Sequence, residues 1–179
     1  MNNMIYPIWL TRELRSDHAG ETGAIWIYKG ILGFSVNNKV RIFARRHLET
    51  ELKHLKKLEG LLSQEHRSRL LPIWRLAGFL TGAIPALCGC NMTFRTIDAV
   101  EKFVVDHYQN QINDLQSILD DNPSLKIVHS ILCECLSDEA KHRDEAIQAS
   151  GNASGKIIRL WSLLISRGSR LAVSLARRF

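Results

Sequence analysis

Two Glu-x-x-His motifs, Glu51-x-x-His54 and Glu139-x-x-His142, constrain the fold of this chain more than any other feature of its sequence. Residues three apart lie on one face of an α-helix, so each motif can present a carboxylate and an imidazole together. Either motif alone is equally typical of a charged helix that faces water. The choice between a metal site and a surface helix therefore depends on what the rest of the chain places beside the motifs.

Helical periodicity runs through nearly the whole chain, and no alternating pattern predicts a β-strand. Turn signals at residues 37–38 and 120–123 divide the pattern into helix pairs, and Thr11 is the expected N-cap of the first helix. We therefore predict an all-α protein with a single domain over residues 1–179. The expected helices cover about 11–36, 38–66, 92–119 and 123–150 for a four-helix bundle, 70–90 for an apolar crossover, and 156–176 for a basic C-terminal helix.

The turns place a second carboxylate opposite each motif. If the first turn folds two helices into an antiparallel hairpin, position 52 faces a residue near position 22, and Glu21 lies there. Counting equal distances on either side of the second turn places position 102 opposite the later motif, and Glu101 lies next to that position. Each half of the chain thus supplies one Glu on one helix and one Glu-x-x-His on its partner.

Four carboxylates and two imidazoles from four helices form the ligand set of a dinuclear metal site, as in ferritin-like di-iron and di-manganese proteins. The carboxylates offset most of the charge of two divalent ions, and the imidazoles complete the mixed oxygen and nitrogen coordination that iron or manganese accepts. Without a metal, four buried Glu side chains would repel one another or take up protons. We therefore predict that a dinuclear centre is held by Glu21, Glu51, His54, Glu101, Glu139 and His142.

Other polar residues near these positions have more than one interpretation. Tyr28 and Tyr108 each follow a predicted ligand by seven residues, and core packing is the default interpretation for both. Hydrogen bonding at the site is the alternative for Tyr28. Asp17, His18 and Asp138 either orient ligands or lie on the surface. The remaining histidines are interpreted as core or surface residues, with Asp106 as a solvated partner of one of them: His47, His66, His107 and His129.

The positive charge of the chain is concentrated near its C-terminal end. The formal net charge is +6, and no acidic residue follows Glu145. On a helix over 156–176, basic residues gather on one side and apolar residues on the other, which is typical of a helix lying on an anionic membrane surface. Packing of the apolar face on the bundle is the alternative. No motif for reading nucleic acid accompanies this basic stripe, so nucleic-acid binding is not expected.

The segment 70–90 is almost wholly apolar, but it contains Arg75 and its uncharged part is shorter than the roughly 20 residues that span a bilayer. A buried crossover helix and an interfacial helix are the two alternatives. We favour the second and predict a peripheral membrane protein whose two apolar helices face the membrane and admit a lipid-like substrate. The first residues lack a secretory pattern, so the four cysteines are expected to be reduced, on the cytoplasmic face of the cell (inner) membrane.

The chain resembles the demethoxyubiquinone hydroxylase family, the di-iron enzymes of late ubiquinone synthesis, over nearly its whole length. The matching stretches are RSDHAGETGA, Glu51-x-x-His54, AVEKFVVDHYQNQI, DEAKHRDEA, LPIWRLAGFLTGA and GSRLAVSLARRF. The resemblance implies a ferritin-like fold on a membrane, two iron ions per chain on the six predicted ligands, and hydroxylation of a demethoxyubiquinone or demethoxyubiquinol ring with O2. It also implies that Tyr108 lies near the site. The chain departs from the family at Thr22, where Tyr is usual, and at Lys102, where an acid is common.

Two further functions remain open at the level of sequence. A ferritin-like protein that scavenges peroxide or handles metal would use the same ligands, and a lipid-binding subunit without enzymatic activity would leave them unused. For the hydroxylase, we expect a prenylated quinone substrate and a membrane surface as partners. Electrons are expected from an external donor or through the quinol, because the chain has no flavin or NAD fingerprint. A homo-oligomer or a partner that delivers the quinone stays open.

Overall fold

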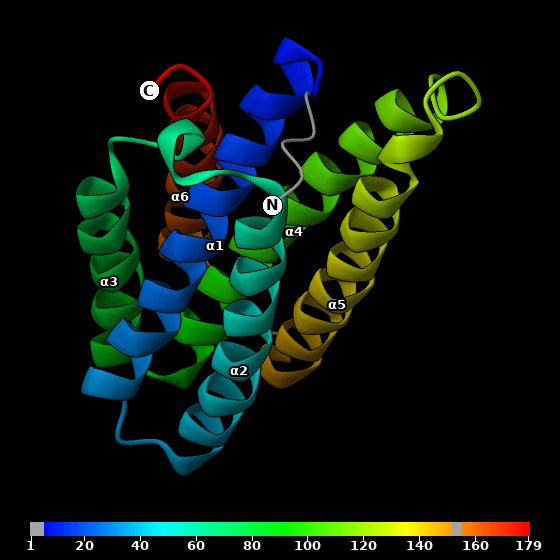
Figure 1. Cartoon of the computed structure of the whole chain (residues 1–179). Coiled ribbons are helices and arrows are strands. Elements are labelled where there is room, and N and C mark those ends of the chain that lie inside the picture. The colour runs from blue at the N-terminus through cyan, green and yellow to red at the C-terminus, as the bar shows by residue number, and fades with distance from the viewer. Residues whose placement is uncertain (1–5, 152–154) are drawn as a thin grey trace.

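The computed structural model describes residues 6–151 and 155–179, and over these residues it contains six α-helices, two short 3-10 turns and no β-strand. The helices are α1 (Ile8–Phe34), α2 (Asn38–Leu61), α3 (Leu71–Cys88), α4 (Cys90–Gln116), α5 (Lys126–Ser150) and α6 (Lys156–Ala176). The bundle consists of two antiparallel hairpins, α1 with α2 and α4 with α5 (Figure 1). The all-α, ferritin-like bundle predicted from the sequence is thereby confirmed.

The first helix begins earlier than predicted. It starts at Ile8, directly after Pro7, and the expected N-cap residue Thr11 lies inside its first turn. The reason is that the Thr11 N–H already donates to the Pro7 carbonyl oxygen at 3.0 Å, which is a helical hydrogen bond. The next helix begins where the sequence predicts, because Asn37 Oδ1 caps it by accepting from the Val40 N–H at 3.2 Å.

Two other helix ends also differ from the predicted ranges. Helix α2 ends at Leu61, and residues 64–66 form a separate 3-10 turn in which Ser63 Oγ bonds to the His66 ring at 2.8 Å. Such local side-chain bonds compete with continuation of a helix. A single residue, Gly89, separates α3 from α4, and its φ of 107° is a backbone conformation that side-chain-bearing residues rarely adopt.

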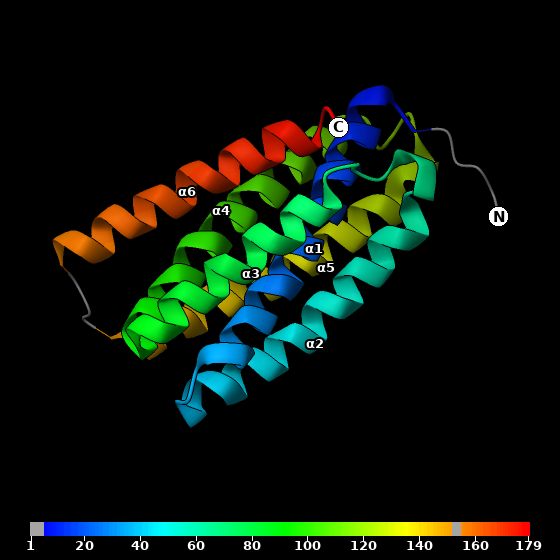
Figure 2. The same ribbon diagram turned by 90° about the vertical axis from the view of Figure 1, so that its left-hand side faces the viewer.

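Helix α3 carries the chain from the first hairpin to the second and packs along α1 in direct backbone contact. A Cβ atom at Gly78 would overlap the carbonyl of Gly23, and one at Gly82 would overlap the carbonyl of Ile27. Only residues without a side chain allow this approach. The contact holds α3 against α1 as a side wall of the bundle (Figure 2).

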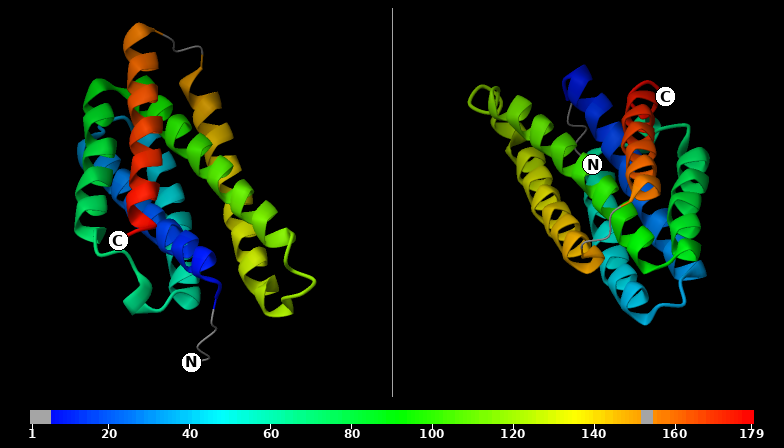
Figure 3. Two further views of the ribbon diagram at one scale, coloured as in Figure 1. Left: turned by 90° about the horizontal axis from the view of Figure 1, so that it is seen from above. Right: turned by 180° about the vertical axis from the view of Figure 1, so that it is seen from behind.

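Helix α6 packs on α4 and α1, so that α3 and α6 flank α1 from two sides (Figures 2 and 3). Trp161 Nε1 donates to Thr96 Oγ1 of α4 at 2.8 Å. Near the end of the chain, the Arg177 guanidinium pairs with the Glu13 carboxylate of α1 at 2.7 Å. Only Ile165 and Ala176 of α6 are buried, and several of its large apolar residues remain exposed: Ile157, Leu160, Leu163, Leu164 and Leu171.

Two apolar clusters fill the bundle, one toward each end. The first contains Leu14, Leu58 and Leu132, and the second contains Phe43 and Phe94. Along each of the four bundle helices, the predicted metal ligands lie between the residues of the two clusters. Packing on both sides therefore holds the polar residues at the middle of the bundle.

Candidate metal centre

The four bundle helices turn the six predicted ligands toward one interior region. The ligand atoms form two groups, and within each group they lie within 4.8 Å of one another: Glu21, Glu51, His54 and Glu139 in one, and Glu51, Glu101, Glu139 and His142 in the other. Each of the six residues is at most 4% exposed. Glu51 and Glu139 belong to both groups, so they lie where carboxylates that bridge two metal ions would lie.

Both imidazoles point Nδ1 into this region. His54 Nδ1 lies 3.0 Å from Glu139 Oε1, and His142 Nδ1 lies 3.1 Å from Glu51 Oε1. On its outer side, His54 Nε2 lies 3.3 Å from Asp138 Oδ2. A carboxylate on the far nitrogen holds an imidazole in the orientation that a metal ligand needs. The sequence interpretation of Asp138 as a residue that orients a ligand agrees with this contact.

Many inward atoms have no hydrogen-bond partner among the residues that the structure describes. They are Glu21 Oε2, Glu51 Oε1, His54 Nδ1, both oxygens of Glu139, and His142 Nδ1. The short distances between them therefore lack hydrogen-bond geometry, and unpaired buried polar atoms are unfavourable. Two divalent cations would satisfy these atoms together, and the donor set of carboxylate oxygen and imidazole nitrogen fits iron or manganese.

The charges of the cluster are strongly coupled. Burial and the neighbouring carboxylates raise the pKa of Glu51 and Glu101 well above the usual carboxyl range. Burial also acts to raise the pKa of Glu139, but the adjacent His142 and His54 rings lower it to about 2. Burial acts to lower the pKa of His54, but Glu139 and Glu21 raise it to about 11. Without metal, the cluster thus retains protons that divalent cations would displace.

Two tyrosines, one in each half of the bundle, donate hydrogen bonds to the candidate ligands. The Tyr28 hydroxyl donates to Glu101 Oε1 at 2.9 Å, and the Tyr108 hydroxyl donates to Glu21 Oε1 at 2.5 Å. Burial raises the pKa of both phenols well above 10, so they remain protonated donors. Core packing alone, the default interpretation for these residues, is therefore wrong. Their spacing of seven residues from a ligand was the available signal.

The remaining histidines are not members of either candidate group. His47 is buried with its ring 4.0 Å from the ring of His142, and burial together with the charge of His142 lowers its pKa to about 3. His66 is exposed and His129 is half-buried. The interpretation of these three as core or surface residues agrees with their positions.

Two sequence interpretations on α1 and α4 need correction. His107 pairs with Asp17, at 3.0 Å between Nε2 and Oδ1, and not with its exposed neighbour Asp106. Asp17 consequently faces α4 and orients no candidate ligand. His18 is also buried, and among the described residues its ring pairs with Glu59, at 3.8 Å, and with no candidate ligand.

A cavity of about 440 Å³ connects the cluster with the surface. Residues of α1, α3, α4 and α6 line it, and most of them are apolar. At one end are the buried carboxyl groups of Glu51 and Glu139, whereas Leu164 and Leu171 at the other end are about 60% exposed. An apolar ligand can therefore extend from the outside of the molecule to the candidate metal centre.

Residues 9–176 match the family model described as "Ubiquinone biosynthesis protein COQ7". The match covers nearly the entire chain. The chain belongs to this family.

Curated relatives, of which this chain covers about three quarters, support the assignment. The chain is 32% identical to "NADPH-dependent 3-demethoxyubiquinone 3-hydroxylase, mitochondrial" of Dictyostelium discoideum, over 94% of this chain and 77% of the relative. It is 32% identical to "3-demethoxyubiquinol 3-hydroxylase" of Rhodospirillum rubrum, over 94% of this chain and 78% of that relative. It is 30% identical to the human protein with the same description as the Dictyostelium one, over 93% of this chain and 76% of the human protein. The resemblance seen in the sequence is thereby confirmed.

Proposed function

We propose that this chain is a di-iron monooxygenase that hydroxylates the ring of demethoxyubiquinone or demethoxyubiquinol in ubiquinone biosynthesis. Two iron ions per chain would be held by Glu21, Glu51, His54, Glu101, Glu139 and His142. The observation that carries the proposal is that the buried Glu and His cluster forms the inner end of an apolar cavity. The names of the relatives supply the substrate class.

The balance of the reaction defines what the protein must provide. One atom of O2 enters a ring C–H bond to give the hydroxyl group, and the other leaves as water, which consumes two electrons and two protons. When bound, the iron ions supply the reductive activation of O2. The electrons come from outside the chain or through the quinol, and NADPH, which appears in the names of several relatives, is the first donor to test.

The residues of the chain contribute binding and order. Tyr28 and Tyr108 hold the carboxylates of Glu101 and Glu21 through their hydroxyl groups, which limits the rotation of these carboxylates. Asp138 holds the His54 ring. The apolar walls from α3 and α6 accept the ring and the first part of the prenyl tail and keep water away from the reacting carbon.

The substrate is lipid-soluble, so we also propose that the chain works on a membrane surface. Exposed apolar side chains gather on α3 and α6: Ile73, Leu76, Leu80, Ile84, Leu87, Ile157, Leu160, Leu164 and Leu171. Four of them also line the cavity: Leu80, Ile84, Leu164 and Leu171. Helix α3 is the one described helix long and apolar enough to cross a membrane by length and composition alone, and 28% of it is buried. We favour peripheral attachment, because Arg75 lies within α3 and the exposed basic residues of α6 suit an anionic surface.

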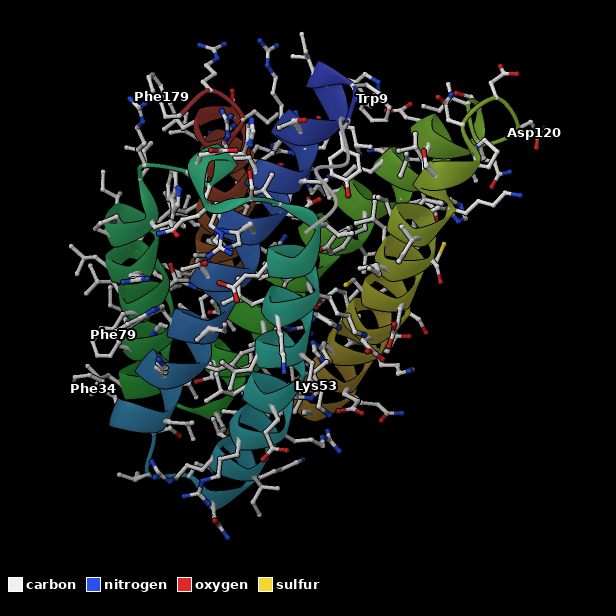
Figure 4. All side chains as sticks on the ribbon, viewed as in Figure 1. Trp9, Phe34, Lys53, Phe79, Asp120 and Phe179 are labelled. Atoms are coloured by element: carbon white, nitrogen blue, oxygen red, sulfur yellow. The ribbon has the colours of Figure 1, made fainter. Side chains whose placement is uncertain are left out.

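An aromatic group at one end of α1 and α3 supports the same arrangement. Phe34 and Phe79 lie edge to face with ring centroids 6.0 Å apart, and both rings point outward (Figure 4). Trp26 lies 6.3 Å from Phe79 and carries the Lys29 ammonium 4.5 Å from its ring centroid. Tryptophan side chains such as that of Trp26 are enriched at membrane–water interfaces. The four free cysteines are compatible with the cytoplasmic face of the cell (inner) membrane.

The metal content and the quinone product test the proposed function together. We expect about two iron ions per chain in the wild type and their loss in Glu139→Ala, because this carboxylate belongs to both ligand groups. Gln148→Ala, an exposed change on the same helix, is the matched control and should retain iron. Cells without the protein should accumulate a ubiquinone precursor that lacks one methoxy group, and the wild type and Gln148→Ala should reverse this.

Two results would count against the hydroxylase. Full iron content in Glu139→Ala would contradict the ligand assignment. Stoichiometric iron with an unchanged quinone profile would favour the ferritin-like alternative, in which the protein consumes peroxide or stores metal. The large apolar cavity supports the hydroxylase over that alternative, since peroxide and metal ions need no such space.

A further inference from the structure

A polar pair in the cavity wall takes no part in the candidate metal centre. Asp17 of α1 and His107 of α4 both line the cavity, with His107 Nε2 3.0 Å from Asp17 Oδ1. Neither residue belongs to the groups of potential metal ligands among the described residues. Apolar side chains surround the pair in this wall, including Phe103 and Val104. Polar atoms in such a wall are the natural place to recognise the polar part of a substrate.

The two oxygens of Asp17 differ in their surroundings. Oδ1 accepts from His107 and also from Gln111 Nε2, at 2.7 Å. Oδ2 is buried and makes no hydrogen bond within residues 6–151 and 155–179. The side chain is 0% exposed. Burial raises the pKa of Asp17, and the hydrogen bonds from His107 and Gln111 offset only part of this rise. Oδ2 is thus a buried acceptor without a donor, which a suitable ligand would stabilise.

The same contacts define the proton position on His107. An ionised Asp17 carboxylate can only accept, so the hydrogen that it shares with His107 comes from His107 Nε2, which also lies 2.8 Å from Gln111 Nε2 and 3.4 Å from Ser16 Oγ. In the neutral imidazole, Nδ1 then carries a lone pair and is an acceptor. His107 Nδ1 makes no hydrogen bond to any described residue, and its side chain keeps 10% exposure. Both free atoms of the pair are therefore acceptors.

We propose that Asp17 Oδ2 and His107 Nδ1 accept a hydrogen bond from a ring hydroxyl of the substrate, so that the cavity selects the reduced, hydroquinone form of the ring. This inference rests on the proposed function, because it requires a quinone-type ring in the cavity. A hydroquinone offers O–H donors, whereas the carbonyl oxygens of a quinone carry only lone pairs and are repelled by a carboxylate. A site with buried acceptors rejects the ligand that cannot donate, since the acceptors then stay unpaired.

Binding can be measured without turnover. Trp74 and Trp161 line the cavity, so their fluorescence reports the entry of a ring. The probes are a short-chain demethoxyquinone and the same compound reduced to the hydroquinone. They are titrated under nitrogen into the full chain loaded with Zn²⁺, which has no redox chemistry and leaves each ring in its starting oxidation state. We expect the wild type to bind the hydroquinone about tenfold more tightly or better, as suits a hydrogen bond to a charged acceptor.

Two variants test the pair, with thermal melting as a check of folding. In Asp17→Asn, the donors from His107 and Gln111 keep the amide oxygen at the position of Oδ1, so the NH2 group replaces Oδ2. This change should abolish the preference or reverse it toward the quinone. His107→Phe removes the Nδ1 acceptor and should reduce the preference. Asp106→Asn, an exposed change beside His107 and outside the cavity lining, is the control and should keep the wild-type ratio.

The outcomes separate this inference from the proposed function. A wild type that binds both ring forms equally, or variants that weaken both by the same factor, would overturn the role of the pair and leave the hydroxylase proposal standing. A purely structural pair gives the second result, because it cannot change the ratio of the two affinities. A wild type that binds neither ring would overturn both proposals.

Discussion

At the scale of single residues, the site consists of buried carboxylates and imidazoles, and many of their inward atoms have no hydrogen-bond partner among the described residues. Glu51 and Glu101 have raised pKa values because burial and neighbouring carboxylates oppose their charge. His54 has a pKa raised to about 11, since Glu139 and Glu21 outweigh its burial. Tyr28 and Tyr108 each donate one hydrogen bond to a carboxylate but do not neutralise it. The stability of the metal-free protein is therefore linked to pH through this cluster.

We expect the metal-free protein to lose stability between pH 7 and pH 9. Groups with a raised pKa in the folded chain stabilise it fully below their unfolded pKa and lose this contribution as pH rises toward the folded pKa. For His54 this window runs from 6.5 to about 11, and Glu51 and Glu101 act in the same direction. The lowered pKa of Glu139 affects stability only below pH 4.5, and that of His47 only below pH 6.5, so neither changes stability between pH 7 and pH 9.

Melting temperatures of the chelator-treated protein at several pH values measure this effect. Addition of Fe²⁺ under nitrogen should reduce the fall, because metal ions replace the protons on the ligands. His54→Gln should flatten the dependence, and the exposed change His66→Gln should leave it as in the wild type. A metal-free protein that becomes more stable toward pH 9 would contradict the assigned charges.

At the scale of elements, the cavity depends on how closely α3 lies against α1. Gly78 and Gly82 bring the two backbones together, and their Cβ positions would overlap the carbonyls of Gly23 and Ile27. Because the two helices lie this close, residues of both α1 and α3 line the same cavity. A side chain at either glycine would push α3 outward and change the width of the cavity.

Gly82→Ala should destabilise the protein by about 1–3 kcal/mol, because overpacked helices must separate. Gly60→Ala is the matched control, since no atom lies within 4 Å of its Cβ position and it is in an exposed helical site. That change should be neutral or stabilising by roughly 0.5–1 kcal/mol. Urea unfolding measures both. Equal effects of the two substitutions would mean that the α1–α3 contact is not as close as described.

At the scale of the whole molecule, two helices outside the four-helix bundle, α3 and α6, contribute to the wall of the cavity. Helices α3 and α6 both pack on α1 (Figure 2). Some of their exposed apolar residues, including Leu80 and Leu164, line the cavity. Exposed basic residues accompany them on α6, including Arg167 and Arg170. The opposite side of the bundle, formed by α2 and α5, has no comparable concentration of exposed apolar side chains among the described residues.

We expect the protein to bind vesicles that contain anionic lipid more tightly than neutral vesicles, and the difference to shrink as salt increases. Leu164→Asp with Leu171→Asp should weaken binding about tenfold or more, because two apolar side chains no longer enter the bilayer. Leu52→Asp on α2, where the native residue is 49% exposed, is the matched control. Sedimentation with vesicles measures all three proteins. An equal loss of binding in the control would argue against α6 as the attachment surface.

The candidate ligands could be predicted from sequence because helix geometry is local. Every residue adds the same rise to an α-helix, so residues equally far before and after a turn lie opposite each other in the two helices of a hairpin. Reflection across the turns therefore identified Glu21 and Glu101 from the two Glu-x-x-His motifs. The bounds of α6 followed from the same local periodicity.

The cavity and its polar pair were decided by the tertiary structure. Asp17 and His107 are far apart in sequence, and their contact depends on how α1 and α4 cross and on the place of Gln111 beside them. The close approach of α3 to α1 likewise results from helix packing, which no short window of sequence encodes. Periodicity and turn positions determined which residues face inward, whereas the angles between packed helices determined which of them meet, because those angles depend on contacts summed over the whole molecule.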